Sequence, residues 1–284
     1  MKIVSSGKVL NSREFYKKKI KKRRFQLILL AIGFLALVSV LVYVSRKERF
    51  LITDVVVLGE NVIDKDELRQ KAEDLLAKHY LWLFPRSNIL TYPRGEIRQS
   101  LLKAFPRLKS LDLNLDQDRR LEITVFERVP FALYCNGISD SPIISLKDQV
   151  KDCFFIDKEG LIFALAPLFS SGVYFIYLTE TLLENPIGQR FVTLEEFNAL
   201  QRFITNLVSL NITPSAFLIK TDEYRLILSN GGEIIWRKAS ELSLIYSNLE
   251  AFLNDEAIRT QSNFLDRVRY LDLRTVNKVF YKFK

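Results

Sequence analysis

Hydrophobic side chains fill residues 25–44, a run without any charge in which only Gln26 and Ser39 are clearly polar. At about 1.5 Å of rise per residue, a helix of this length spans about 30 Å, which matches the hydrocarbon core of a membrane. A buried core helix rarely runs so far without a charge, and a cleaved signal peptide has a shorter apolar run followed by a small-residue cleavage site. Here the run passes directly into a charged segment at residues 45–49. The pattern predicts an uncleaved transmembrane helix.

After this segment, the pattern predicts a strand followed by a helix. Residues 52–58 are rich in β-branched side chains and stop at Gly59, as a strand that ends in a turn does. Asp64 and Glu67 then form an acidic variant of the capping box that begins many helices. The apolar residues that follow recur at helical spacing and share one face: Leu68, Ala72, Leu75 and Leu76.

A loop, a second helix and two more strands are predicted next. Residues 79–93 form the loop, which carries apolar and aromatic side chains at 80–84, and the short helix after it ends before Pro106. Leucine alternates with polar residues at 111–115, and apolar residues alternate again at 121–125. A polar turn joins the two stretches, so they predict a hairpin with one buried face. The order is therefore β-α-α-β-β.

The rest of the chain reads as a larger unit dominated by strands, which together with the first unit predicts an α+β protein. Its turn at residues 229–232, Ser-Asn-Gly-Gly, predicts a hairpin. One helix opens at Thr193 with Glu196 three residues later, and a second begins near Ser240. The first helix should bury Phe197, Leu200, Ile204, Leu207 and Val208. The expected strands are residues 131–134, 153–156, 173–178, 216–220, 224–228, 233–236, 268–274 and 278–283.

Basic residues gather at the N-terminus. The chain has 42 Lys and Arg against 33 Asp and Glu, a formal charge of +9, and residues 1–24 hold ten basic residues and one acidic residue. Those 24 residues account for the whole excess, so the remainder is neutral and nucleic-acid binding is not expected. Nine Lys or Arg lie within the 20 residues before the apolar run and three within the 20 after it. The positive-inside rule then places residues 1–24 in the cytoplasm as a basic tail, which would also attract anionic lipids.

Few side chains offer catalytic chemistry. A single His and two Cys exclude most metal sites and most His-based catalytic triads. Asp157 and Glu159 could be an acid-base pair, but a polar turn ending at Gly160 explains them better. His79 lies at a predicted helix end, where it complements the helix dipole. We expect no catalytic residue, no metal, no cofactor and no small-molecule substrate.

Cys135 and Cys153 flank the loop between two predicted neighbouring strands. If the positive-inside rule holds, both lie outside the cytoplasm, where disulfides form and persist. We predict a disulfide between them, which the chain-entropy model values at about 3 kcal/mol. The alternative is two small buried thiols.

The last predicted strand, residues 278–283, is the best candidate for a partner-binding edge. Four of its residues strongly favour strands: Val279, Phe280, Tyr281 and Phe283. An extended segment of a partner could pair with it by β-augmentation. The alternative is a strand paired on both sides. Its three lysines would either guard the edge or attract an acidic segment: Lys278, Lys282 and Lys284.

Five short motifs follow one another along the chain. They are V-V-V-L-G at 55–59, F-P at 105–106, E-R-V-P-F-A at 127–132, I-D-K-E-G at 156–160 and Y-L-D-L-R at 270–274. In this order, downstream of a single anchor, they resemble the FtsQ/DivIB family of bacterial cell-division proteins over nearly the full chain. Two features depart from the family pattern: Glu60 intervenes between Gly59 and Asn61, and the loop at 80–84 is unusually apolar.

The resemblance implies a basic cytoplasmic tail at 1–24, a transmembrane helix at 25–44, a POTRA domain at 50–128 and an FtsQ-type β domain at 129–284. It implies a non-enzymatic scaffold of the bacterial division complex, held in the cytoplasmic membrane at the septum with its folded domains outside. FtsB/FtsL-like partners would bind the C-terminal sheet edge, and other membrane proteins of the complex would contact the POTRA domain. The expected partner-binding residues are Tyr270, Arg274, Val279, Phe280, Tyr281 and Phe283.

Two alternatives stay open from the sequence. One is a membrane-anchored enzyme of the cell envelope, against which the missing nucleophile and metal patterns argue. The other is a POTRA-containing helper of protein assembly, which would usually carry several tandem POTRA units or a barrel.

Overall fold

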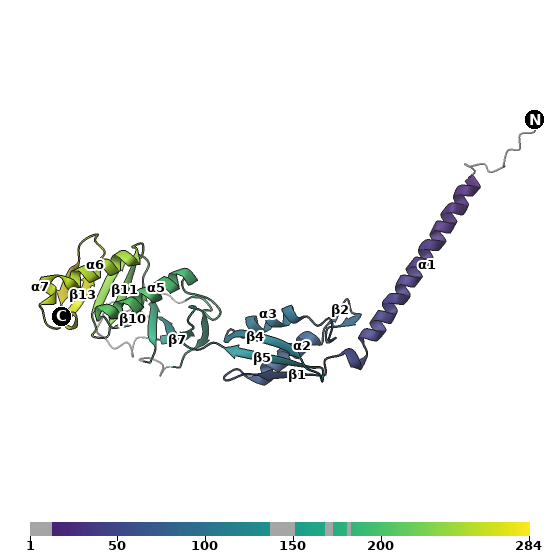
Figure 1. The fold of residues 1–284 in the computed structure, drawn as a ribbon, viewed down its shortest axis with the longest axis horizontal. Helices are drawn as coiled ribbons and strands as arrows, with labels where there is room; N and C mark the ends of the chain where they lie inside the picture. Colours follow the sequence, from purple (N-terminus) through teal and green to yellow (C-terminus); the bar gives the residue numbers. More distant parts are fainter. Residues whose placement is uncertain (1–12, 137–150, 168–172, 181–182) are drawn as a thin grey trace, which may run out of the picture. The chain divides into compact units, whose positions relative to one another are not determined.

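The computed structural model describes residues 13–136, 151–167, 173–180 and 183–284 (Figure 1). The chain divides into two compact units. The N-terminal unit consists of Met1–Leu101 and Leu111–Val125, and the C-terminal unit consists of Leu102–Ser110 and Phe126–Lys284. The protein is a mixed α+β structure with a large, sheet-rich C-terminal part.

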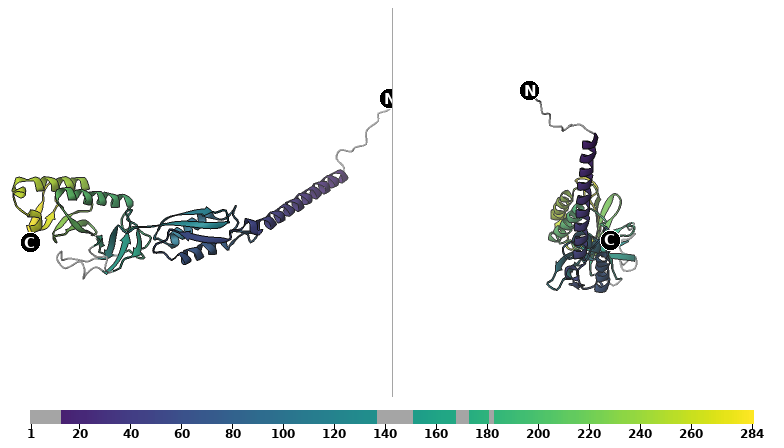
Figure 2. Two further views of the ribbon diagram at one scale, coloured as in Figure 1. Left: turned by 60° about the horizontal axis from the view of Figure 1, so that its bottom comes forward. Right: turned by 90° about the vertical axis from the view of Figure 1, so that its right-hand side faces the viewer.

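The first element is a single long helix, α1 (Arg13–Ser45), which runs without a break in all three ribbon views (Figures 1 and 2). Within it, Tyr16–Ser45 is long and apolar enough to span a membrane. Its large apolar side chains are exposed along most of its length, as the lipid-facing side of a membrane helix would be. A short 3₁₀ turn, η1 (Glu48–Phe50), follows.

A three-stranded sheet with two helices comes next. Its strands are β1 (Asp54–Leu58), β4 (Leu108–Leu115) and β5 (Arg120–Glu127), in the order β1-β5-β4, with β1 parallel to β5. The helices are α2 (Lys65–Leu76) and α3 (Arg94–Ala104). The predicted β-α-α-β-β elements are all present, and one hairpin is added between the two helices.

The sequence pattern explains how this sheet and α2 pack. The Asp64 side chain accepts a hydrogen bond from the Asp66 N–H at 2.8 Å and caps α2. The four predicted apolar residues of α2 are buried, and β5 buries Leu121, Ile123 and Val125 on one face, which confirms both periodicities. Gly59 ends β1 at φ +84°, and a Cβ there would lie 2.6 Å from the Val125 carbonyl oxygen, so only glycine fits.

Residues 79–93 were expected to be a loop, and this was wrong in part. The segment contains a small antiparallel hairpin of β2 (His79–Tyr80) and β3 (Phe84–Pro85). Strands of two residues are too short to produce an alternating pattern, so periodicity could not reveal them.

The C-terminal unit is built on a nine-stranded mixed sheet of order β14-β13-β12-β11-β10-β9-β6-β7-β8. All eight strands predicted for this unit form, and the one that was missed is β8, which has only four residues and follows the Gly160 turn. The strands are β6 (Ala132–Asn136), β7 (Lys151–Ile156), β8 (Ile162–Leu165), β9 (Phe175–Thr179), β10 (Pro214–Ile219), β11 (Glu223–Leu228), β12 (Glu233–Arg237), β13 (Val268–Asp272) and β14 (Phe280–Phe283).

Two main helices, α5 (Leu194–Leu207) and α6 (Leu242–Asn254), cover one face of this sheet (Figure 1). The Thr193 hydroxyl accepts the Glu196 N–H at 3.2 Å, as the capping pattern predicted. Val208 was expected on the buried face of α5 but is exposed, because the α-helix gives way to a 3₁₀ turn, η3 (Val208–Leu210), at that residue. Two short helices follow α6: α7 (Glu256–Arg259) and α8 (Phe264–Arg267).

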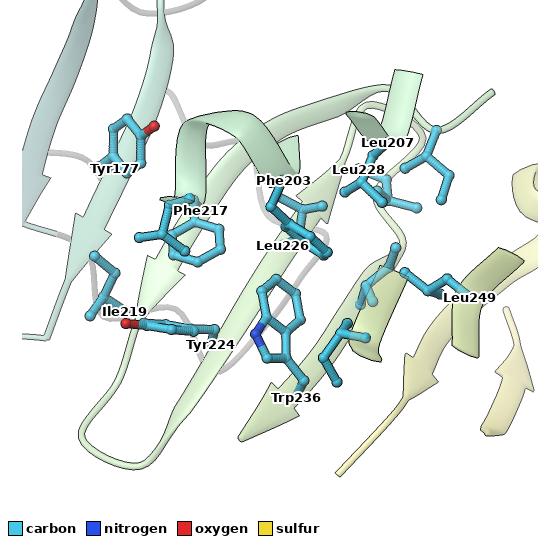
Figure 3. Packing of buried hydrophobic residues seen from close by; sticks show 14 of the residues in the cluster. Tyr177, Phe203, Leu207, Phe217, Ile219, Tyr224, Leu226, Leu228, Trp236 and Leu249 are labelled. Carbon is cyan, nitrogen blue, oxygen red and sulfur yellow. The ribbon is translucent and has the colours of Figure 1, made fainter. Parts of the chain in front are cut away.

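The larger hydrophobic cluster of the C-terminal unit lies between the sheet and these helices, with Trp236 near its centre (Figure 3), and a smaller cluster includes Leu133, Ile176 and Leu218. The Trp236 indole is fully buried, and its ring centroid lies 5.1 Å from Phe203, 5.7 Å from Phe217 and 5.9 Å from Tyr224. Burial, with the hydrogen bond to Glu196 as a smaller cause, raises the pKa of the Tyr224 hydroxyl. Aromatic pairs at these distances stabilise a protein beyond what the burial of their apolar surface contributes, so this cluster should dominate the stability of the unit.

Candidate functional site

The candidate site is the edge of the nine-stranded sheet formed by β14. This strand is antiparallel to β13, with Leu271 opposite Tyr281 and Asp272 opposite Phe280. Within the parts of the chain that the structure describes, no strand pairs with the outer side of β14. An edge of this kind presents a row of backbone donors and acceptors to an incoming segment.

The backbone groups that face outward can be assigned. The Lys284 N–H donates to the Arg267 carbonyl at 3.0 Å, so Lys284 faces β13. Backbone groups alternate in direction along a strand, which turns the N–H and C=O of Tyr281 and Phe283 toward the open side. An extended partner segment would find two residues of β14 ready to pair.

The opposite edge, β8, differs because another part of the chain covers its start. The Ile162 N–H donates to the Gln189 carbonyl at 2.9 Å, and the Gly188 N–H donates to the Ile162 carbonyl at 2.7 Å. Leu161 also forms an antiparallel bridge with Arg190. Of the two edges, β14 is therefore the more accessible one.

One face of β14 packs against the helices. The Tyr281 ring lies 5.7 Å from Phe252 in α6, 5.4 Å from Phe264 in α8 and 5.5 Å from Phe283. Phe283 and Val279 pack against the core. Three of the six residues expected to bind a partner thus hold the strand in place, and of these Tyr281 is still 41% exposed.

The other face of β14 carries Phe280 and Lys282. Register places Phe280 opposite Asp272 and Lys282 opposite Tyr270, so these four side chains share the face of the sheet that lies away from the helices. Phe280 is 52% exposed, so a large apolar side chain lies open to solvent beside this edge. Phe280 and Tyr281 are the more exposed aromatic side chains of this edge, and Tyr270 is only partly exposed.

Arg274, another expected partner residue, belongs to a charge network. Its guanidinium donates to Asp272 at 2.6 Å and to Glu223 at 2.9 Å. Hydrogen bonds from Arg274 lower the pKa of Asp272 below its ordinary value. Glu223 also pairs with Arg225 at 2.6 Å. The side chain of Arg274 is about half exposed, so the network supports the edge and still leaves part of this cation accessible.

Lys284 has a structural contact at this edge. Its ammonium group donates to the backbone carbonyls of Asn230 at 2.6 Å and Asp266 at 2.8 Å. These bonds fasten the end of β14 to the β11–β12 turn and to α8. Lys278 and Lys282 are exposed as well.

The structure joins Cys135 and Cys153 in a disulfide. The two residues are directly opposite each other in the antiparallel pair β6 and β7, with Cα atoms 4.2 Å apart. The loop that the bridge closes includes residues 137–150, which lie outside the described residues.

The Asp157 carboxylate stabilises the turn that follows it. It accepts the N–H groups of Glu159 and Leu161, both at 2.9 Å, and a hydrogen bond from Arg128. Glu159 pairs with Lys109 at 3.3 Å. His79, expected at a helix end, is an exposed residue of β2 instead.

Arg128, a residue of the E-R-V-P-F-A motif, ties three segments together. Besides its bond to Asp157, its Nε donates to the Pro106 carbonyl at 3.1 Å, and its own N–H donates to the Arg107 carbonyl at 2.8 Å. The side chains of Arg128 and Asp157 are 14% and 8% exposed. This buried pair gives Arg128 a structural role.

No protein-family model matches this sequence, and no curated protein matches it either. The functional assignment therefore depends on the residues described above.

Proposed function

We propose that this protein is a membrane-anchored scaffold that captures an extended segment of a partner at the outer side of β14. The observation that carries the proposal is an open edge strand with an exposed phenylalanine, in a chain whose α1 is long and apolar enough to span a membrane. The excess of basic residues before α1 supports an N-terminus in the cytoplasm and folded units outside.

The motif resemblance supports a more specific proposal. As an FtsQ/DivIB-like protein, the chain would be a non-enzymatic member of the bacterial division complex in the cytoplasmic membrane at the septum. Its segment 50–128 would be a POTRA domain that contacts other membrane proteins of the complex. FtsB/FtsL-like coiled-coil proteins would be the partners at β14.

The size of the edge sets the strength expected of such an interaction. Two outward residues offer at most about four backbone hydrogen bonds, each with a net value of about 1 kcal/mol. Ordering the partner segment costs free energy of similar size, so side-chain burial must supply the rest. Covering the Phe280 ring would contribute about 2 kcal/mol. Phe280 is therefore the residue whose loss should reduce binding most clearly.

A matched pair of substitutions tests the proposal. The full chain, in detergent, would be co-purified with the FtsB/FtsL-like pair of the same bacterium, using wild type, Phe280→Asp and Leu165→Asp. Leu165 is the control because it is a 62% exposed apolar residue on β8, the other edge of the same sheet. Substitutions are preferable to a truncation before β14, which would also remove Tyr281 and Phe283 from the aromatic cluster.

We expect Phe280→Asp to weaken capture at least tenfold and Leu165→Asp to leave it unchanged, with both variants showing the circular dichroism spectrum of wild type. Equal capture by all three proteins would refute binding at β14. An equal loss of capture in both variants would show that added surface charge weakens binding in general and that binding is not specific to β14.

A further inference from the structure

The tip of the β2–β3 hairpin has a conformation that its residues disfavour. Leu81 and Trp82 have φ values of +48° and +60°, and the Leu83 N–H donates back to the Tyr80 carbonyl at 3.0 Å. A tight turn with two consecutive positive φ values normally uses asparagine and glycine. Large apolar side chains are therefore present at this turn for a reason other than its backbone geometry.

Packing against the residues that the structure describes does not supply that reason. Leu81 is 83% exposed and Trp82 is 91% exposed, the highest values among the large apolar residues that the structure describes. Leu90, in the segment after β3, is also largely exposed. Apolar side chains gathered so openly in one place indicate a surface that meets another apolar phase.

The hairpin is tied to the end of α1. Arg46 directly follows the last residue of α1, and its guanidinium donates to the Leu83 carbonyl at 3.1 Å and 3.2 Å and to the Trp82 carbonyl at 3.5 Å. The buried Asn88 side chain donates to the Ser45 carbonyl at 3.0 Å. These bonds place the tip of the hairpin at the level where the apolar run of α1 ends.

An apolar pocket of about 440 Å³ lies at the same level. Its lining includes Leu41 and Val44 of α1, Phe50 of η1, and Tyr80, Phe84 and Leu90 around the hairpin. Because Leu41 and Val44 belong to the segment that would lie in the hydrocarbon core, this pocket would open toward lipid chains. Three basic residues follow at once: Arg46, Lys47 and Arg49.

From this juxtaposition we propose that the β2–β3 hairpin is a second, interfacial membrane anchor. Leu81 and Trp82 insert at the boundary between headgroups and acyl chains, where tryptophan is enriched in membrane proteins. Lys47 and Arg49 meet the lipid phosphates, whereas Arg46 holds the hairpin. The inference rests on the proposed membrane anchor. Its consequence is that the N-terminal unit is attached to the bilayer at two points and cannot rotate freely about α1.

Tryptophan fluorescence provides the test, because the chain has only Trp82 and Trp236 and the second is fully buried. The full chain would be reconstituted into vesicles of phosphatidylcholine and phosphatidylglycerol, with and without brominated phosphatidylcholine as a lipid-borne quencher. We expect brominated lipid to quench about half of the total emission in wild type, since one of two tryptophans contacts lipid, and almost none in Trp82→Phe.

The matched control moves the tryptophan within the same unit. Val62 is 65% exposed and lies past the far end of β1, about 16 Å of strand away from η1. The double variant Trp82→Phe/Val62→Trp should show no quenching by brominated lipid and strong quenching by aqueous acrylamide.

Three outcomes would overturn the inference. One is equal lipid quenching in wild type and Trp82→Phe. Another is full access of acrylamide to Trp82 in vesicles. A third is a Trp82 shielded from both quenchers, which would mean that protein covers the hairpin. Flotation of the same vesicles reports α1 separately: protein that floats without lipid quenching refutes the hairpin anchor alone, whereas protein that does not float refutes the membrane anchor itself.

Discussion

The buried ion pair between Arg128 and Asp157 gives the sharpest prediction for the C-terminal unit. Replacing Arg128 with methionine keeps most of the apolar stem of the side chain and removes the guanidinium. The Asp157 carboxylate then stays buried without its cation, and the Pro106 carbonyl loses its hydrogen bond. Removing one partner from a buried pair is strongly destabilising because the remaining charge is uncompensated.

The structure sets the expected size of this effect. Breaking a buried pair costs about 3–5 kcal/mol, and the lower value applies here because Asp157 keeps two backbone N–H donors, from Glu159 and Leu161. We therefore expect Arg128→Met to lower the free energy of unfolding by about 3 kcal/mol. With a urea m value of about 2–3 kcal/mol/M, the midpoint should fall by about 1–1.5 M.

Trp236 makes the measurement specific to this unit, because it lies in the same core and becomes the sole tryptophan in a Trp82→Phe background. Urea unfolding followed by its emission would be compared for Arg128→Met, Asp157→Asn and the double variant. The double-mutant cycle should give a coupling energy of at least about 1.5 kcal/mol. If the midpoint for Arg128→Met stays within 0.3 M of the parent (roughly 1 kcal/mol or less) and partner capture is lost, Arg128 is a partner contact and its structural role is wrong.

Three further predictions concern the same unit and can use the same unfolding assay. Replacing Cys135 and Cys153 with serine should lower the free energy of unfolding by about 3 kcal/mol, because the disulfide no longer restricts the unfolded chain over a sequence separation of 18 residues. Wild type with reductant should match the variant. Gly160→Ala should cost about 2–3 kcal/mol, because φ is +71° and the new Cβ would lie 2.8 Å from a core phenylalanine ring; a cost below about 1 kcal/mol would contradict this. The pKa of Asp272 is lower in the folded protein than in the unfolded chain, where it is near 4, so ionised Asp272 stabilises the fold above that pH. This stability is lost as the pH falls through the folded pKa, and Arg274→Gln should therefore make the free energy of unfolding depend less on pH in acid. An unchanged pH dependence in acid would refute the role of Arg274.

Local periodicity was enough to predict most of the elements, and its failures have local causes. The four buried residues of α2 follow from helical spacing and an acidic cap, both of which are contained within 13 residues. Periodicity failed at Val208 because nothing in the spacing marks the change from α-helix to 3₁₀ turn. It also missed β2, β3 and β8, which are too short to show alternation.

The candidate site was predictable in position but not in the roles of its side chains. Strand propensity at residues 279–283 placed a strand at the end of the chain, and its place at the sheet edge is now visible. The bond between Arg274 and Glu223 joins residues 51 positions apart, so it depends on long-range register that a single sequence does not encode in any local pattern. The same holds for Lys284, whose carbonyl partners come from a turn and a helix far away in the sequence.

The hairpin and the edge strand can be dissected independently, because Trp82 belongs to the N-terminal unit and Phe280 to the C-terminal unit. Substitutions at distant, independent sites usually add in free energy. Trp82→Ser should therefore abolish quenching by brominated lipid and leave partner capture in detergent unchanged, whereas Phe280→Asp should do the reverse. In vesicles that hold both proteins, a loss of capture with Trp82→Ser that is absent in detergent would have one physical reading. It would mean that the second membrane contact orients the protein so that its open edge meets a membrane-bound partner.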